Sequence, residues 1–210
     1  MPPPMPERPR RILIVDDNLE MARTLAALAP YAARGVPVIG IEPSCLFTFR
    51  DELPALIKSE AANALSANAL LLEEFLAREQ KQGRLTLPLG PLPKKALLHG
   101  HCHQKAFDAM GAVESVLKLI PELSVETVES SCCGMAGSFG YDAGTIDVSL
   151  KMGELSLLPA VRKAPADALI VADGTSCRHQ IHDGSGRDVT HVARVLAMSV
   201  AAGPRATASS

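Results

Sequence analysis

Short apolar runs alternate with longer stretches of helical periodicity along most of the chain. The runs with the length of buried strands are 11–16, 36–41, 96–99, 125–129 and 168–172. The stretches with helical periodicity are 19–33, 46–57, 60–83, one that ends near 120, 140–164 and 188–201. This alternation predicts an α/β fold with a mainly parallel sheet built from βαβ units.

The chain also shows a weak internal repeat. An acidic residue and a Ser-Cys pair follow an apolar run twice, as Glu42-Pro-Ser-Cys45 and as Asp173-Gly-Thr-Ser-Cys177. We therefore expect two related units of the α/β type, with the first one incomplete. Their expected boundaries, with a tail at each end, are 1–10 (tail), 11–90 (incomplete unit), 91–203 (complete unit) and 204–210 (tail).

Composition narrows the class of protein. Hydrophobic residues make up 47% of the 210 positions and aromatic residues 3%, so a core of Ala, Leu, Val and Ile is expected. A net charge of -2 gives no basic footprint for nucleic acid. No apolar run reaches the ~18 residues of a transmembrane span, and no secretory signal is expected at the N-terminus. These features predict a cytoplasmic protein, held at most peripherally at the inner membrane through its partners.

Five cysteines in such a chain indicate metal binding or catalysis rather than structural disulfides. Cys102, Cys132, Cys133 and Cys177 each follow a predicted strand. The carboxyl ends of parallel strands lie along one edge of a sheet, so these thiols can converge there. Four thiolates suit a [4Fe–4S] cluster, with a tetrahedral zinc site as the alternative.

The adjacent pair Cys132-Cys133 sets a geometric condition. Neighbouring side chains on an extended strand point to opposite faces, so both can reach one centre only if the backbone turns. Gly134 and Gly137 supply that freedom. The pair also allows a second hypothesis, a thiol/disulfide redox site, because a vicinal disulfide is strained and easily reduced. Cys45 has no local partner and can equally be a small buried apolar residue.

Histidines and charged residues accompany these cysteines. His99, His101 and His103 share one face if the segment is extended, and His101 or His103 is a candidate ligand or hydrogen-bonding neighbour of a ligand. The alternative is that these rings bind backbone carbonyls in a loop. The residues expected to surround the ligands are Lys105, Gly134, Arg178 and His179.

Three segments carry a resemblance to a known family. They are His99-Gly-His-Cys-His-Gln-Lys-Ala106, Glu129-Ser-Ser-Cys-Cys-Gly-Met-Ala-Gly-Ser-Phe-Gly-Tyr141 and Val171-Ala-Asp-Gly-Thr-Ser-Cys-Arg-His-Gln180. They resemble the cysteine-rich CCG domain that occurs in the B subunit of heterodisulfide reductase, the iron–sulfur subunit of glycolate oxidase, the C subunit of anaerobic glycerol-3-phosphate dehydrogenase, and FAD-linked D-2-hydroxyacid dehydrogenases. The resemblance implies that the cluster ligands are Cys102, Cys132, Cys133 and Cys177.

The sequence departs from that family in three ways. The Cys-Cys-Gly motif of a first repeat is missing before Cys45, which matches the last cysteine of that repeat. Gln180 stands where heterodisulfide reductase has the second cysteine of a Cys-x-x-Cys pair. Neither a FAD-binding region nor a ferredoxin-type cysteine run is present, so the chain is not expected to oxidise a hydroxyacid alone.

The first apolar run resembles another family. Arg11-Ile-Leu-Ile-Val-Asp-Asp-Asn18 is similar to the first strand of response-regulator receiver domains, in which the acidic pair, here Asp16 and Asp17, helps to hold Mg²⁺. The phosphate-accepting Asp of that family is not visible. We expect the segment to be a strand of the incomplete first unit instead.

Taken together, these features predict an iron–sulfur domain in electron transfer from a FAD-linked 2-hydroxyacid dehydrogenase of the lactate, glycolate or 2-hydroxyglutarate type. The expected partners are the FAD-containing subunit or domain, which alone carries FAD, and an electron acceptor. Neither nucleic acid nor a transmembrane segment is expected. The alternatives are the thiol redox site at Cys132-Cys133 and a structural zinc site in a fragment without catalytic activity.

Overall fold

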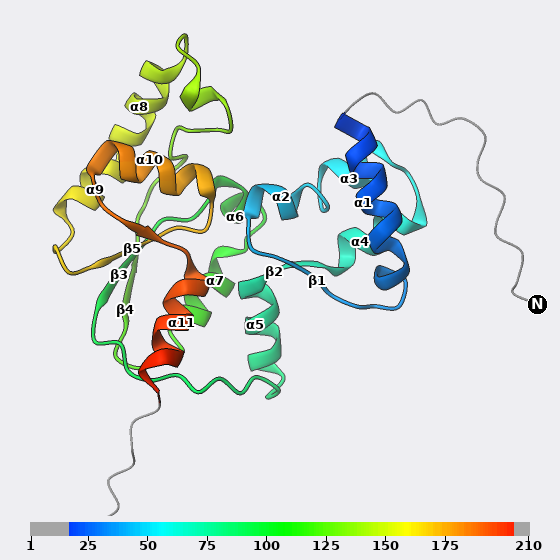
Figure 1. Cartoon of the computed structure of the whole chain (residues 1–210), viewed down its shortest axis with the longest axis horizontal. Coiled ribbons are helices and arrows are strands. Elements are labelled where there is room, and N and C mark those ends of the chain that lie inside the picture. The colour runs from blue at the N-terminus through cyan, green and yellow to red at the C-terminus, as the bar shows by residue number, and fades with distance from the viewer. Residues whose placement is uncertain (1–16, 204–210) are drawn as a thin grey trace, which may run out of the picture. The chain divides into compact units, whose positions relative to one another are not determined.

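The computed structural model describes residues 17–203 (Figure 1). These residues form two compact units, one of residues 17–38 with Phe49–Asn68 and the other of Ile39–Thr48 with residues 69–203. The predicted strand at 11–16, with Asp16, and the two predicted tails lie outside the described residues. The units do not divide at residue 90, and the interpretation of the first part as an incomplete repeat stays a prediction.

The smaller unit is helical. It contains α1 (Asp17–Ala32), α3 (Glu52–Leu56) and α4 (Glu60–Asn68). Leu25, Leu53 and Leu65 are buried in its core. The Asn68 side chain donates to the Ala32 carbonyl at 3.3 Å and so joins the end of α4 to the end of α1.

The larger unit is built on a four-stranded parallel sheet, which confirms the predicted α/β fold. Its strands are β3 (Lys95–Leu98), β4 (Ser124–Thr127), β5 (Leu169–Val171) and β6 (Val189–Thr190), in the order β4-β3-β5-β6. A separate two-stranded sheet pairs β1 (Val38–Gly40) with β2 (Ala69–Leu71).

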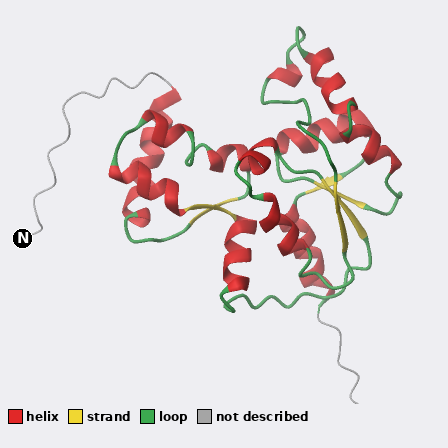
Figure 2. Ribbon diagram, turned by 180° about the vertical axis from the view of Figure 1, so that it is seen from behind, coloured by secondary structure: helices red, strands yellow, loops and turns green. Residues whose placement is uncertain are grey.

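Helices cover both faces of the four-stranded sheet (Figure 2). Ala96 and Leu98 of β3 point to one face, where they pack in one cluster with α5 (Leu72–Lys81), α7 (Met110–Leu117) and α11 (Val192–Ala202). Leu97 points to the other face, in a cluster with α9 (Leu157–Lys163) and α10 (Thr175–Ser185). This alternation follows from the two-residue period of a strand.

The remaining elements are short: α2 (Pro43–Phe47), α6 (Cys102–Ala106), the 3₁₀ turn η1 (Phe139–Tyr141) and α8 (Ile146–Glu154). Several of the long helices predicted from the sequence are interrupted or divided in the structure. The stretch 60–83 is interrupted by β2, whose alternating burial is typical of a strand. The stretch ending near 120 is broken at Asp108, which has φ 54°. The stretch 140–164 is divided, and 188–201 begins with β6.

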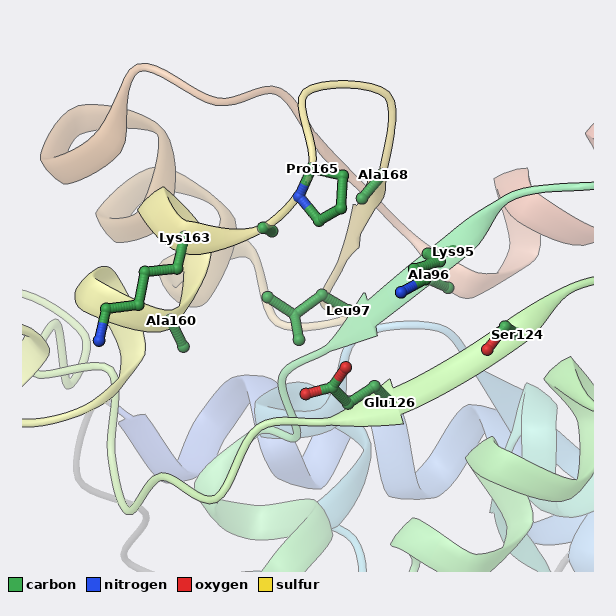
Figure 3. Close-up of a pocket in the computed structure, with 10 residues that line it drawn as sticks. Lys95, Ala96, Leu97, Ser124, Glu126, Ala160, Lys163, Pro165 and Ala168 are labelled. Atoms are coloured by element: carbon green, nitrogen blue, oxygen red, sulfur yellow. The ribbon is translucent and has the colours of Figure 1, made fainter.

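A cavity of about 310 Å³ lies beside β3 and β4 and below the segment that joins α9 to β5 (Figure 3). Lys95 and Ser124 are the first residues of their strands, so the cavity reaches toward the amino ends of the strands. Its described lining contains Glu126 and Lys163 but neither cysteine nor histidine. The cavity therefore lies apart from the cysteines and histidines that follow the carboxyl ends of the strands.

Among the described helices, none combines the length and the apolar character that crossing a bilayer requires.

The burial of two leucines predicts a clear difference in how much each contributes to the free energy of unfolding. Leu117 is 0% exposed in the α7 face of the core, whereas Leu155 is 77% exposed. We expect Leu117→Ala to lower the free energy of unfolding by about 2–5 kcal/mol, because it removes buried methyl groups and leaves a cavity. Leu155→Ala should change it by less than about 0.5 kcal/mol. Urea titrations of both variants measure this, and equal losses would contradict the assigned core.

Candidate metal centre

The carboxyl ends of β3, β4 and β5 carry the cysteines. Cys102 is the first residue of α6 after β3, the Cys132-Cys133 pair lies in the loop after β4, and Cys177 lies in the first turn of α10 after β5. From β3, the chain places β4 on one side and β5 on the other. Open parallel sheets bind ligands in the crevice at such a switch point.

The structure brings together the four cysteines that the sequence singled out. Cys102, Cys132 and Cys133 line one pocket. The sulfurs of Cys133 and Cys177 lie within 4.8 Å of each other, so Cys133 belongs to both groups. All four are free cysteines. The arrangement can therefore offer several sulfur ligands to one centre.

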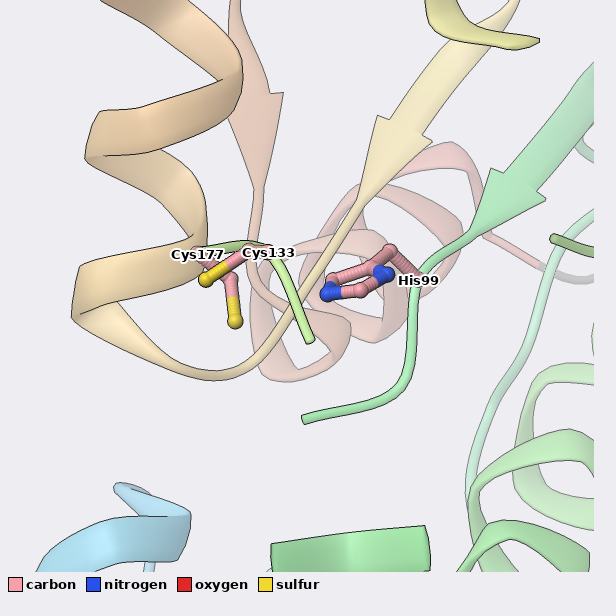
Figure 4. A group of neighbouring side chains, drawn as sticks. All are labelled: His99, Cys133 and Cys177. Carbon is pink, nitrogen blue, oxygen red and sulfur yellow. The ribbon is translucent and has the colours of Figure 1, made fainter. Parts of the chain in front are cut away.

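His99 joins this group, although the sequence does not single it out as a candidate ligand. Ligand atoms of His99, Cys133 and Cys177 all lie within 4.8 Å of one another (Figure 4). His99 continues the ladder of β3, because its N–H donates to the Val171 carbonyl at 2.8 Å. Its side chain therefore points to the same face as Leu97, where the two cysteines are buried. This two-residue alternation is the signal that could have identified it.

The four cysteines differ in how deeply they are buried. Cys133 and Cys177 are buried, Cys132 is half-buried and Cys102 is exposed. A pocket of about 290 Å³ opens here, lined in part by His101, Cys102, Cys132 and Cys133. The site thus has a closed side within the core and an open side toward solvent.

The surroundings shift the pKa values of the four thiols in opposite directions. Donation from Cys133, aided by His99, lowers the pKa of Cys177 to about 5 despite its burial. Donation from Cys102 and Cys133 lowers the pKa of Cys132, and the Gly134 N–H lies 3.3 Å from its sulfur. The same bonds, with burial, raise the pKa of Cys102 and of Cys133. The surroundings of Cys132 and Cys177 therefore lower the pKa of both, which favours the thiolate, the form that binds metals.

The Cys-Cys-Gly turn depends on a close backbone approach. Gly134 has φ 97°, and a Cβ there would lie 2.1 Å from the Ser149 carbonyl oxygen. The buried Gln180 amide donates to that same oxygen at 3.1 Å. Gln180 thus joins α10 to α8 beside the turn.

His101 and His103 lie beside Cys102. The Nδ1 atom of His101 accepts from the His103 N–H at 3.2 Å and lies 3.8 Å from the Cys102 sulfur. The strand ends before these residues, so they do not share one extended face. A Cβ at Gly174 would lie 2.4 Å from the His101 ring, which can approach the end of β5 only because this position is glycine.

The donor set fits a soft metal centre. Thiolate and imidazole are the ligands of iron–sulfur clusters and of zinc. Among the described residues, the buried His99 Nε2 and His103 Nδ1 atoms have no hydrogen-bond partner. Such unsatisfied buried atoms are uncommon in proteins and are expected where a ligand completes the site.

The charged neighbours differ in their roles. Lys105 donates to the carbonyls of Ser130 and Ser131, and all four cysteines act electrostatically on it. Arg178 instead binds the Asp173 carbonyl at the end of β5. His179 is exposed, and its Nδ1 atom lies 2.7 Å from the Tyr141 hydroxyl. Of the cationic residues predicted around the ligands, Lys105 is the one placed to offset negative charge on the sulfurs.

Glu42 positions the helix that carries Cys177. Its carboxylate accepts from the Thr175 N–H at 2.9 Å and from the Thr175 hydroxyl at 2.8 Å, at the start of α10. Burial raises the pKa of Glu42, but the bonds from Thr175 and Ser44 outweigh it and leave the pKa lowered. Cys45, three residues on, is exposed, and it is not among the residues that line the pocket.

Comparisons with known proteins find dehydrogenases and a dehydrogenase subunit. The chain is similar to the C subunit of anaerobic glycerol-3-phosphate dehydrogenase from Escherichia coli K12. It is 31% identical over 168 residues, which cover 80% of this chain and 41% of that protein. It is also similar to D-2-hydroxyglutarate dehydrogenases. The identity is 29% over 175 residues for Escherichia coli K12 and 27% over 181 residues for Pantoea ananatis, covering 83% of this chain in each case.

The chain spans only part of these relatives. It matches 41% of the glycerol-3-phosphate dehydrogenase subunit, and 16% and 17% of the two D-2-hydroxyglutarate dehydrogenases. No family model matches the chain. No solved structure matches it either. The resemblance inferred from the motifs thus agrees with the named relatives, whereas the CCG domain itself is not named by a family model.

Glu42 gives a prediction with a defined pH dependence. Its carboxylate caps α10, so Glu42→Ala should lower the free energy of unfolding by about 0.5–2 kcal/mol at pH 7. The pKa in the folded state is depressed below the ordinary value of 4.5, so the contribution is complete above that pH. The contribution is then lost as the pH falls through the folded pKa.

Urea titrations at pH 7 and at successively lower pH measure this effect. Glu129→Ala is the control, because Glu129 is exposed in the loop before the cysteine pair. A Glu42→Ala deficit that stayed constant down to low pH would exclude the carboxylate as its cause.

Proposed function

We propose that the larger unit binds an iron–sulfur cluster and passes electrons between a FAD-containing dehydrogenase and an electron acceptor. The proposed ligands are Cys102, Cys132, Cys133 and Cys177. The observation that carries the proposal is that cysteines from three strand ends gather at one place. Cys102, Cys132 and Cys133 line one open pocket, and the Cys177 sulfur lies within 4.8 Å of that of Cys133. A [4Fe–4S] cluster is the type that four cysteine ligands favour.

The surrounding residues support a negatively charged centre. Lys105 supplies a positive charge near all four sulfurs. The first turn of α10 presents backbone N–H groups near Cys177, and the Gly134 N–H lies near the Cys132 sulfur. Hydrogen bonds and positive charge near cluster sulfurs set the reduction potential. These groups would therefore favour electron uptake.

An iron–sulfur cluster, when bound, supplies one-electron transfer. The chain's own contribution would be to hold the sulfurs and to limit their contact with water. Cys133 and Cys177 are buried within the core, whereas Cys102 is exposed. The exposed side is where an electron partner could approach. His99, which has a ring nitrogen within 4.8 Å of the Cys133 and Cys177 sulfurs, would lie beside the buried part of the cluster.

The partner and its substrate are also part of the proposal. The relatives are named as a component of anaerobic glycerol-3-phosphate dehydrogenase and as D-2-hydroxyglutarate dehydrogenases. Both names support a dehydrogenase partner for this chain. We propose that this partner carries the FAD and the substrate pocket, and that its substrate is a 2-hydroxyacid. The present chain would not be catalytic alone.

Single cysteine variants test the cluster. After anaerobic reconstitution, we expect the wild type to hold iron and sulfide in a ratio near one, at about four iron atoms per chain, with broad visible absorbance. Cys102→Ser, Cys132→Ser, Cys133→Ser and Cys177→Ser should each lose most of that iron. Cys45→Ser is the matched control and should keep it, because Cys45 is exposed and lies outside the pocket lining.

Circular dichroism must show that each variant is folded before its iron content is interpreted. A colourless wild type with one zinc ion per chain would replace the proposal with a structural zinc site. The thiol redox site would be favoured by a different result. In that case the wild type holds no metal, loses two titratable thiols at Cys132 and Cys133 on oxidation, and regains them on reduction. Equal iron loss in Cys45→Ser and Cys102→Ser would contradict the assigned ligands.

A reduction assay tests the partner. We expect the cluster-loaded chain to lose visible absorbance when mixed anaerobically with a FAD-dependent D-2-hydroxyglutarate dehydrogenase domain and its substrate. The same mixture with glycerol 3-phosphate and its dehydrogenase is the parallel arm. Bleaching by dithionite but in neither arm would exclude both partners while leaving the cluster intact.

A further inference from the structure

A second group of ionisable side chains lies near the same edge of the sheet, with two of its members buried and the third, His191, partly buried. Glu73 is in the first turn of α5, Asp173 follows β5, and His191 precedes α11. Ligand atoms of these three residues all lie within 4.8 Å of one another. None of them belongs to the cysteine site.

The two carboxylates are placed where an isolated charge is costly. Glu73 and Asp173 are each 1% exposed. Neither carboxylate oxygen of Glu73 has a hydrogen-bond partner among the described residues. Burial, with the charge of Asp173 added, raises the pKa of Glu73 to about 8. Buried carboxylates without partners are rare, and they are usually neutralised by a proton or a cation.

Asp173 and His191 are already held in position. Asp173 accepts from the Gln104 amide at 2.8 Å and from the Val192 N–H at 3.1 Å. The Nε2 atom of His191 lies 2.7 Å from the Ile41 carbonyl, so this nitrogen carries the proton and donates. Metal-binding histidines commonly donate their second ring N–H to a backbone carbonyl in this way.

The remaining ring nitrogen faces the carboxylates. The Nδ1 atom of His191 accepts from the Ala193 N–H at 3.0 Å and lies 3.5 Å from an oxygen of Asp173. A nitrogen lone pair and a carboxylate oxygen are both acceptors and cannot bond to each other. A cation bound at Nδ1 would take the lone pair that now accepts from the Ala193 N–H, because an imidazole nitrogen has only one. Ligand atoms of all three side chains lie within 4.8 Å of one another.

We propose that Glu73, Asp173 and His191 bind one divalent transition-metal ion. Its two positive charges balance the two carboxylates, so the buried site becomes neutral. One imidazole with two carboxylates suits Mn²⁺, Fe²⁺ or Zn²⁺. The ion ties the start of α5 to the ends of β5 and β6.

The spacing favours an ion over a proton shared between the two acids. Carboxyl groups that share a proton lie about 2.5–2.7 Å apart. Glu73 has no such contact with any described residue. An ion about 2.0–2.2 Å from each ligand holds neighbouring ligand atoms roughly 3–3.5 Å apart. The 3.5 Å between His191 Nδ1 and the Asp173 oxygen lies in that range.

Manganese titration tests the site on the full chain, stripped of metal by a chelator. Mn²⁺ is the probe because it prefers oxygen and nitrogen to the nearby thiolates. We expect the wild type to bind one Mn²⁺ per chain, seen as loss of the free-ion signal in electron paramagnetic resonance. Glu73→Gln should weaken binding by at least about tenfold. Glu74→Gln, the same change one residue on, should weaken it by less than about threefold.

Thermal melting gives the second readout. Mn²⁺ should raise the Tm of the wild type and of Glu74→Gln but not that of Glu73→Gln. Without metal, Glu73→Gln should melt above the wild type, because a neutral amide replaces a buried acid. A wild type that neither depletes the free-ion signal nor gains Tm would overturn the proposal. Equal binding by Glu73→Gln and the wild type would overturn it too, since the ion would then lie elsewhere.

Discussion

The in-register ends of three parallel strands are the constraint on which both sites depend. Leu98 of β3 is paired with Thr127 of β4 and with Val171 of β5, so the three strands end at one level. The ladder continues for one step, because the Val128 N–H donates to the Leu98 carbonyl at 2.8 Å. A shift of one residue would turn every side chain to the opposite face. The His99 side chain would then point to the face of the sheet opposite the buried sulfurs.

Two groups of candidate metal ligands lie at this edge, on opposite faces of the sheet. The sulfurs of Cys133 and Cys177 lie with the core cluster that α9 and α10 form, whereas Glu73 is carried by α5 on the other face. Gln104 connects the two groups. Its amide N–H donates to Asp173 at 2.8 Å, and its carbonyl accepts from the His101 N–H at 2.9 Å. A single neutral side chain thus fixes both the loop before Cys102 and a carboxylate of the second group.

The sequence could predict the strands and the cysteines because both leave local patterns. Apolar runs followed by cysteine placed Cys102 and Cys177 at strand ends. The helix expected over 60–83 failed at β2, because Ala69-Leu70-Leu71 has high helical propensity and is held as a strand by pairing with β1. Glu73 could not be found in this way. An acid in the first turn of a helix is ordinarily a favourable exposed charge, and its burial arises from tertiary packing.

The two copies of the acidic–Ser-Cys motif have different roles in the larger unit. The repeat predicts two related halves, yet Cys177 is buried and Cys45 is exposed. The first copy contributes a different group. Glu42 caps α10, which begins at Thr175 within the second copy, and the His191 ring binds the Ile41 carbonyl beside Glu42. The segment Ile39–Thr48 therefore belongs with residues far along the chain. Its charge acts by orienting α10, and with it the sulfur of Cys177, whether or not Cys45 has any chemistry of its own.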